Sequence, residues 1–199
     1  GPRRRRRRGE EIHAGDASPR AKCLEMKKPA EFGGMTVDRQ QLETSYVTLN
    51  TQVKPFDNAK VRQAVNMAIN KDRIVRIING RATPASQVLP PLMPGYDKDF
   101  AGFDYSVDKA KALLAEAGLA DGFETVLYAT NTDPQPRIAQ AIQQDLAAIG
   151  VKAEIRALAQ GNVIAAGGTE GEAPMIWSGG MAWIADFPDP SNFYGPILG

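Results

Sequence analysis

The residues best suited to chemistry gather in one segment, Trp183-Ile184-Ala185-Asp186-Phe187-Pro188-Asp189-Pro190. It follows an apolar run and the pair Gly179-Gly180, and α/β proteins commonly place ligand sites in loops at the ends of strands. Two carboxylates three residues apart suggest a glycosidase pair, but that chemistry needs opposed carboxyl groups about 5–9.5 Å apart. Neighbours in a loop rarely oppose one another. We therefore expect no catalytic pair, and we expect Asp189, which precedes Pro190, to serve a turn.

Asp186 differs from Asp189 because it stands among aromatic and apolar residues, with no basic residue within five positions. A carboxylate that is buried without a partner is costly, so Asp186 needs a cation from elsewhere. That cation is either an internal arginine or the ammonium group of a ligand, and the spacing leaves both open.

The composition excludes several other kinds of site. The chain has one cysteine, Cys23, and one histidine, His13, so it lacks an internal disulfide and any zinc-finger spacing. A Ser/His/Asp triad would have to use His13, which lies in an unpromising segment. We predict no metal, no cofactor and no enzyme activity. An apolar fraction of 43% and a charged fraction of 24% are typical of a globular protein, and no apolar run approaches the roughly 18 residues of a membrane span.

The charge is divided unevenly along the chain, although the net charge is only +1. Residues 1–34 contribute +5 and residues 35–199 contribute −4. The head opens with six arginines, Arg3 to Arg8, and such dense like charges favour an extended chain. We expect residues 1–34 to be a disordered basic head or a fusion remnant. It lacks the apolar stretch of a secretory signal and the interleaved aromatic residues that stack on bases, and nucleic acid is an unlikely partner for the acidic body.

From residue 35 onward the hydrophobic periodicity indicates alternating strands and helices. It predicts a strand at 45–51, a core-facing helix from Asp57 or Asn58 to Gly80, a helix from Ser106 to Gly118, a strand at 123–128, a helix from Pro136 to Gly150, and strands at 151–158 and 173–178. Strand, helix and strand from 123 to 158 form a βαβ unit with parallel strands. The segment 82–96 is rich in proline, which opposes regular structure, yet it is apolar enough to be an ordered loop packed on the domain or lining a cleft.

A series of short segments in this order resembles one family. They are YVTLNT at 46–51, PFD at 55–57, VRQAV at 61–65, LPP at 89–91, PGY at 94–96, LLAEAG at 113–118, AQAIQ at 139–143, and the 183–190 segment with Asn192-Phe193. Together they resemble the C-terminal lobe of the bacterial extracellular solute-binding proteins of family five, the peptide-binding proteins of ABC importers. The resemblance implies an α/β lobe of a type II, periplasmic-binding-protein-like fold over residues 35–199, truncated at its C-terminus, with the partner N-terminal lobe missing.

The resemblance also implies a function. Such a protein captures a peptide-like solute outside the cytoplasm, in the periplasm or at the membrane, and delivers it to an ABC importer permease without changing it. Asp186 would pair with the α-ammonium of the ligand, and Trp183 would form an apolar wall. The arginine that some dipeptide binders use for the ligand carboxylate has no equivalent near Ala129, and we do not transfer its role to Arg137. The ligand is therefore left open between a peptide and another solute.

Two other functions remain as alternatives. A basic-tailed module that binds nucleic acid or a membrane surface rests only on Arg3 to Arg8. A hydrolase that uses Asp186 and Asp189 is a distant third.

Overall fold

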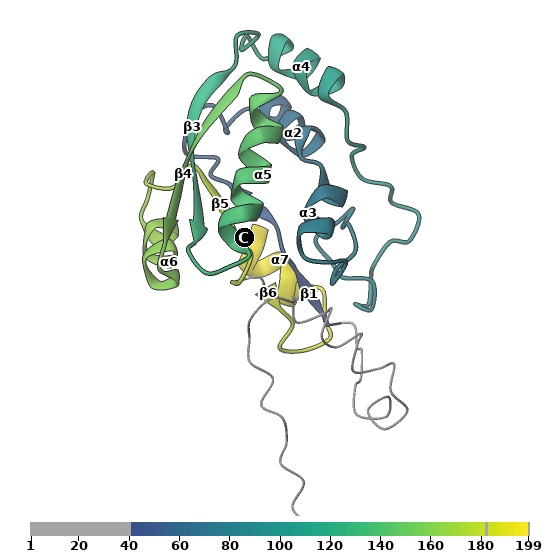
Figure 1. Cartoon of the computed structure of the whole chain (residues 1–199). Coiled ribbons are helices and arrows are strands. Elements are labelled where there is room, and N and C mark those ends of the chain that lie inside the picture. The colour runs from purple at the N-terminus through teal and green to yellow at the C-terminus, as the bar shows by residue number, and fades with distance from the viewer. Residues whose placement is uncertain (1–40, 182, 199) are drawn as a thin grey trace, which may run out of the picture. The chain divides into compact units, whose positions relative to one another are not determined.

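The structure is a computed structural model that describes residues 41–181 and 183–198 (Figure 1). The basic head predicted for residues 1–34 lies outside the described residues. Four strands form the main sheet in the order β2 (Val47–Leu49), β5 (Met175–Trp177), β3 (Phe123–Thr130) and β4 (Val151–Leu158). Strands β3, β4 and β5 are parallel, and β2 runs antiparallel to β5.

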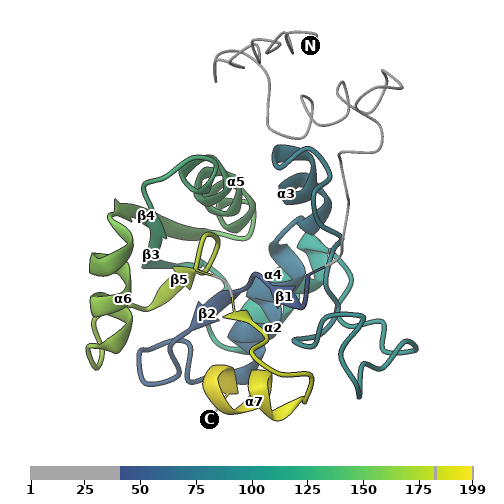
Figure 2. The same ribbon diagram turned by 90° about the horizontal axis from the view of Figure 1, so that it is seen from below.

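Helix α5 (Gln135–Ala147) connects β3 to β4 and packs on one face of the sheet, so the predicted βαβ unit is confirmed. Helix α6 (Gln160–Gly168) covers the opposite face (Figures 1 and 2). Side chains alternate between the two faces of a strand, and β3 accordingly feeds two apolar clusters. Leu127 packs with Ile142 on the α5 side, and Tyr128 packs with Val163 on the α6 side.

Two further helices pack into the same core as α5, and each begins at a side-chain cap. In α2 (Ala59–Ala68) the Asn58 side chain accepts a hydrogen bond from the Lys60 amide. In α4 (Val107–Glu116) the Ser106 side chain accepts one from the Lys109 amide. An oxygen at the N-cap satisfies an amide that has no partner inside the helix. Both predicted helix starts are confirmed.

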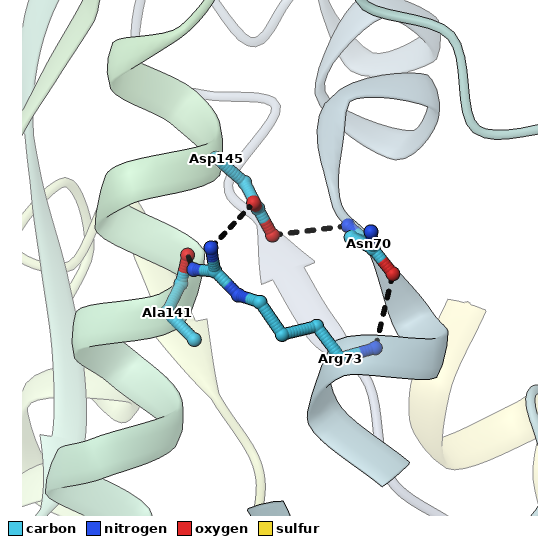
Figure 3. Close-up of polar contacts among 4 residues, drawn as sticks. All are labelled: Asn70, Arg73, Ala141 and Asp145. Carbon is cyan, nitrogen blue, oxygen red and sulfur yellow. Dashed lines mark hydrogen bonds and ion pairs between the residues drawn. The ribbon is translucent and has the colours of Figure 1, made fainter. Parts of the chain in front are cut away.

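The single helix predicted to run as far as Gly80 is wrong, because the chain breaks after Ala68 and restarts as α3 (Lys71–Ile77). Asn70 causes the break (Figure 3). Its side chain accepts a hydrogen bond from the Arg73 amide at 3.0 Å and so caps a new helix. The backbone N–H of Asn70 donates to the buried carboxylate of Asp145 in α5 at 3.0 Å. The apolar periodicity continues past the break and therefore predicted one helix. The break depends on Asp145, which only the tertiary fold brings next to Asn70.

Arg73 completes this connection between α3 and α5. One of its guanidinium nitrogens, Nη1, lies 3.3 Å from Asp145 Oδ1, and Nη2 donates to the Ala141 carbonyl. Figure 3 shows the four residues facing one another across the gap between the two helices. The group therefore fixes α3 against α5 although no residue of α3 is fully buried.

A second, two-stranded sheet pairs β1 (Glu43–Thr44) with β6 (Trp183–Ile184) in antiparallel orientation. The predicted ordered loop at 82–96 lies beside it, has no helix or strand, and is confirmed as packed on the domain. Its Leu89 and Met93 are buried with Phe193, which comes from the last helix, α7 (Ser191–Leu198). The residues described include no helix that is both long and apolar enough to cross a membrane.

Candidate functional site

Strand β6 begins the predicted site segment, and its side chains alternate in exposure. Trp183 and Ala185 pack against the cluster of Leu89, Met93 and Phe193. Ile184 is 56% exposed, and Asp186 is exposed as well. Because successive side chains of an extended chain point to opposite sides, this alternation places Asp186 on the side away from the cluster.

Strand β1 holds the start of the segment in register. Thr44 lies opposite Trp183, and Glu43 lies opposite Ile184. Beyond the strand pair, the Ala185 amide donates to the Leu42 carbonyl at 2.8 Å. The hydroxyl of Thr44 donates to the Val88 carbonyl at 2.8 Å, which ties β1 to the proline-rich loop. The backbone leading to Asp186 is therefore held by the β1 segment, which is itself tied to the proline-rich loop.

The path of the chain from β5 toward the site segment requires glycine at position 179. The Trp177 indole N–H donates to Gln135 Oε1 at 2.7 Å, and the backbone of Gly179 passes directly beside this pair. A Cβ at Gly179 would lie 2.2 Å from Gln135 Oε1 and 2.2 Å from Trp177 Nε1. No side chain fits at that distance, so glycine is required for the chain to leave β5 along this path.

Asn192, in the first turn of α7, connects the two predicted ligand residues. It is buried, with 6% of its surface exposed. Its side-chain oxygen accepts a hydrogen bond from the Trp183 indole N–H at 3.2 Å and another from the Asp186 amide at 3.0 Å. One carbonyl oxygen has two lone pairs and can satisfy both donors. Asn192 thus closes the loop between β6 and α7. The sequence did not predict it as a site residue.

Asp189 forms the turn that starts α7. Its Oδ1 accepts the Ser191 amide at 2.9 Å and the Ser191 hydroxyl at 2.6 Å. These hydrogen bonds, that of the Ser191 hydroxyl first, stabilise the charged form and hold the pKa of Asp189 below its usual value. The carboxylate is committed to its own turn, as a residue in an Asx-turn is.

Within the described part of the chain, the Asp186 carboxylate has no such partner. Across residues 41–181 and 183–198, the ion pairs involve other acids, and Asp186 is in none of them. Of the two sources of a cation that the sequence left open, an internal arginine is therefore not found in the described part of the chain. The geometry brings Trp183 and Asp186 together through Asn192, and it holds Asp189 apart on Ser191.

Arg137, to which we assigned no ligand role, forms an ion pair at 2.8 Å with Asp133, which lies four residues earlier, just before α5 begins. Hydrogen bonding and the charge of Asp133 raise the pKa of this exposed guanidinium. The part of the chain that the structure describes contains no group of three or more His, Cys, Asp or Glu side chains placed to hold a metal ion.

The family model described as bacterial extracellular solute-binding proteins, family 5 Middle, matches residues 11–199. The chain belongs to this family. The predicted α/β class of periplasmic-binding-protein type and the predicted resemblance are thereby confirmed. Two curated relatives are similar over most of the chain. Heme-binding protein A of Haemophilus influenzae is 38% identical over 178 residues, covering 82% of this chain and 30% of the relative. The dipeptide-binding protein of Escherichia coli is 36% identical over 183 residues, covering 85% and 34%.

Among solved structures, the periplasmic binding protein DppA from Helicobacter pylori in complex with the peptide STSA matches with a TM-score of 0.71 and 35% identity. The match covers 77% of this chain and 29% of that one. The chain thus spans about a third of the length of the curated relatives it matches.

Proposed function

We propose that the complete protein captures a peptide with a free N-terminus outside the cytoplasm and delivers it to an ABC importer permease in the membrane, without chemistry on the ligand. Membership of a solute-binding family supports capture. The part of the complete protein that corresponds to the rest of its longer relatives would close over the ligand from the other side, as hinged lobes do.

One observation carries the proposal of a peptide. Asp186 presents an exposed carboxylate, its backbone is fixed by Asn192 and by the β1–β6 pair, and no described lysine or arginine pairs with it. A fixed carboxylate without a protein cation suits a ligand that brings its own. A charge-assisted bond between a carboxylate and an ammonium group is among the stronger polar contacts, and it strengthens when closure removes water.

We infer a smaller contribution from Trp183 as an apolar wall, because its side chain lies on the cluster side of the segment and Asp186 on the other side. Its indole N–H is already bonded to Asn192, so its remaining contribution to a ligand is the partly exposed surface of the ring.

The names of the relatives do not indicate which ligand this chain binds. A heme-binding protein and a dipeptide-binding protein are about equally identical to this chain. The peptide proposal therefore depends on Asp186, and its test has to isolate the ammonium group.

The test compares Asp186→Asn with the unchanged protein in calorimetric titrations of a short peptide. We expect binding to weaken by about 2–5 kcal/mol, because a desolvated ammonium loses its counter-charge. Asp189→Asn is the matched control, since an asparagine oxygen still accepts the Ser191 hydrogen bonds, and it should cost much less. Acetylating the peptide N-terminus should weaken binding to the unchanged protein and matter little to Asp186→Asn. Equal binding of the free and acetylated peptides would instead point to a neutral solute such as an oligosaccharide.

A further inference from the structure

Among the described residues, Asn192 is the one buried polar side chain that hydrogen-bonds to both predicted ligand residues, to the Trp183 indole and to the Asp186 backbone amide. We propose that Asn192 is a positioning residue of the binding site, which fixes the direction of the Asp186 carboxylate toward the ligand. This inference rests on the proposed function of Asp186. It goes beyond that function because Asn192 would contribute to affinity without touching the ligand.

The first step is how Asn192 itself is held. The next residue in α7, Phe193, is fully buried in the cluster with Leu89 and Met93. The backbone N–H of Asn192 donates to the backbone carbonyl of Asp189 at 3.0 Å. A buried aromatic residue on one side and a backbone bond on the other leave the Asn192 side chain little freedom.

The second step is what Asn192 holds. After Ala185 the chain leaves the β1–β6 ladder, and the Asp186 amide has no strand partner there. Asn192 Oδ1 replaces that partner at 3.0 Å and accepts the Trp183 indole at 3.2 Å. The side chain thereby fixes the backbone of Asp186 just as the chain turns toward Asp189. Because a side chain follows its backbone, losing this bond would let the carboxylate rotate.

The third step is energetic. When a carboxylate binds an ammonium group, its side chain loses conformational entropy, and this loss opposes binding. A carboxylate that is already held in place loses less entropy and therefore binds more tightly. For metal ligands, loss of a hydrogen-bonded outer partner typically weakens affinity ~10–100-fold. By analogy we expect Asn192→Ala to weaken binding of a free peptide by about tenfold, which is less than the loss of Asp186 itself.

The decisive measurement is the ratio of affinities for a free and an N-acetylated tripeptide, Ala-Ala-Ala, in the complete protein. This ratio isolates the ammonium contact. Asn192→Ala should reduce the ratio about tenfold. Leu89→Val is the control for general stability, because it thins the same cluster without touching either hydrogen bond. It should lower the melting temperature and leave the ratio unchanged.

A second measurement needs no ligand. Hydrogen exchange of the Trp183 indole N–H, followed by NMR, should quicken in Asn192→Ala. The Trp177 indole, bonded to Gln135, is an internal reference that should not change. Unchanged exchange at Trp183 would overturn the proposal even if the alanine variant bound peptide poorly.

The outcomes separate this proposal from the proposed function. If the unchanged protein discriminates between the two peptides and Asn192→Ala discriminates equally well, Asn192 is not a positioning residue, although Asp186 still binds ammonium. If the unchanged protein binds both peptides equally, or binds neither, both the peptide function and a role for Asn192 in ammonium binding are wrong.

Discussion

Replacing Asp145 by alanine tests whether the contact between α3 and α5 is held by the polar group in Figure 3. The carboxylate is 6% exposed and accepts the Asn70 amide at 3.0 Å, while Arg73 Nη1 lies 3.3 Å from its other oxygen. The substitution removes both interactions but leaves both donors in place. It also removes the partner that places the break between α2 and α3.

The expected loss in the free energy of unfolding is the sum of the costs of the two donors that the substitution leaves without a partner. An amide N–H without an acceptor in a part-buried position costs about 1–3 kcal/mol. Removing one partner of a buried ion pair costs about 3–5 kcal/mol, but Arg73 is 31% exposed and can be partly solvated. The unpaired arginine should therefore cost about 1 kcal/mol. Together these give a loss of about 3 kcal/mol in the free energy of unfolding.

Urea unfolding of this chain, followed by far-UV circular dichroism, measures the loss. Asp145→Asn separates the two contributions, because its oxygen still accepts the Asn70 amide while the charge is lost, and it should cost much less than Asp145→Ala. Glu116→Ala removes a shorter ion pair, 2.9 Å to Lys60, whose side chains are about half exposed, and it should cost less than about 1 kcal/mol. A cost for Asp145→Ala no larger than that of Glu116→Ala would refute the reasoning, since burial would then have no effect on the cost.

Asp145 and Gly179 each give one further prediction. Burial raises the pKa of Asp145 above its ordinary value, against the opposing effects of the Asn70 amide and the Arg73 charge. The folded state therefore binds this proton more tightly than the unfolded state. The stability of the unchanged chain relative to Asp145→Asn should fall as the pH rises above about 4, the ordinary pKa of an aspartate, and a rise measured by urea unfolding would show that Arg73 outweighs burial. Gly179→Ala should cost about 1–3 kcal/mol through overpacking against Trp177 and Gln135; Gly161→Ala in α6, where a Cβ meets nothing within 4 Å, should instead stabilise by about 0.5–1 kcal/mol, and equal effects of the two in thermal unfolding would contradict the crowding at Gly179.

The elements that could be predicted from the sequence are those whose signals are local. Ser106 and Asn58 cap helices through amides two or three residues away. Strand β4 was predicted with its observed bounds, Val151–Leu158, because alternation and a preceding Gly150 mark it within a few residues. Such signals need no partner from elsewhere in the chain.

The elements that were missed depend on distant residues or lack a signal. The break before α3 requires Asp145, which lies 75 residues beyond Asn70. Helix α6 has Ala159 at its N-cap, without a side-chain hydrogen bond, and it contains Gly161, Gly167 and Gly168, so its sequence resembles a loop. Strands β1 and β6 have two residues each, too few to show alternation.

The same distinction applies to the candidate site. Asp186 was singled out because its neighbours in sequence offer no cation, and the described structure adds none from farther away. Asn192 could not be recognised in that way, because an asparagine near the start of a helix is ordinarily a capping residue. Its role requires that Phe193 be buried and that Trp183 lie within reach of the same side chain. The candidate ligand residue Asp186 can thus be proposed from the lack of a nearby cation in the sequence, whereas the positioning role proposed for Asn192 can be recognised only from contacts that the fold supplies.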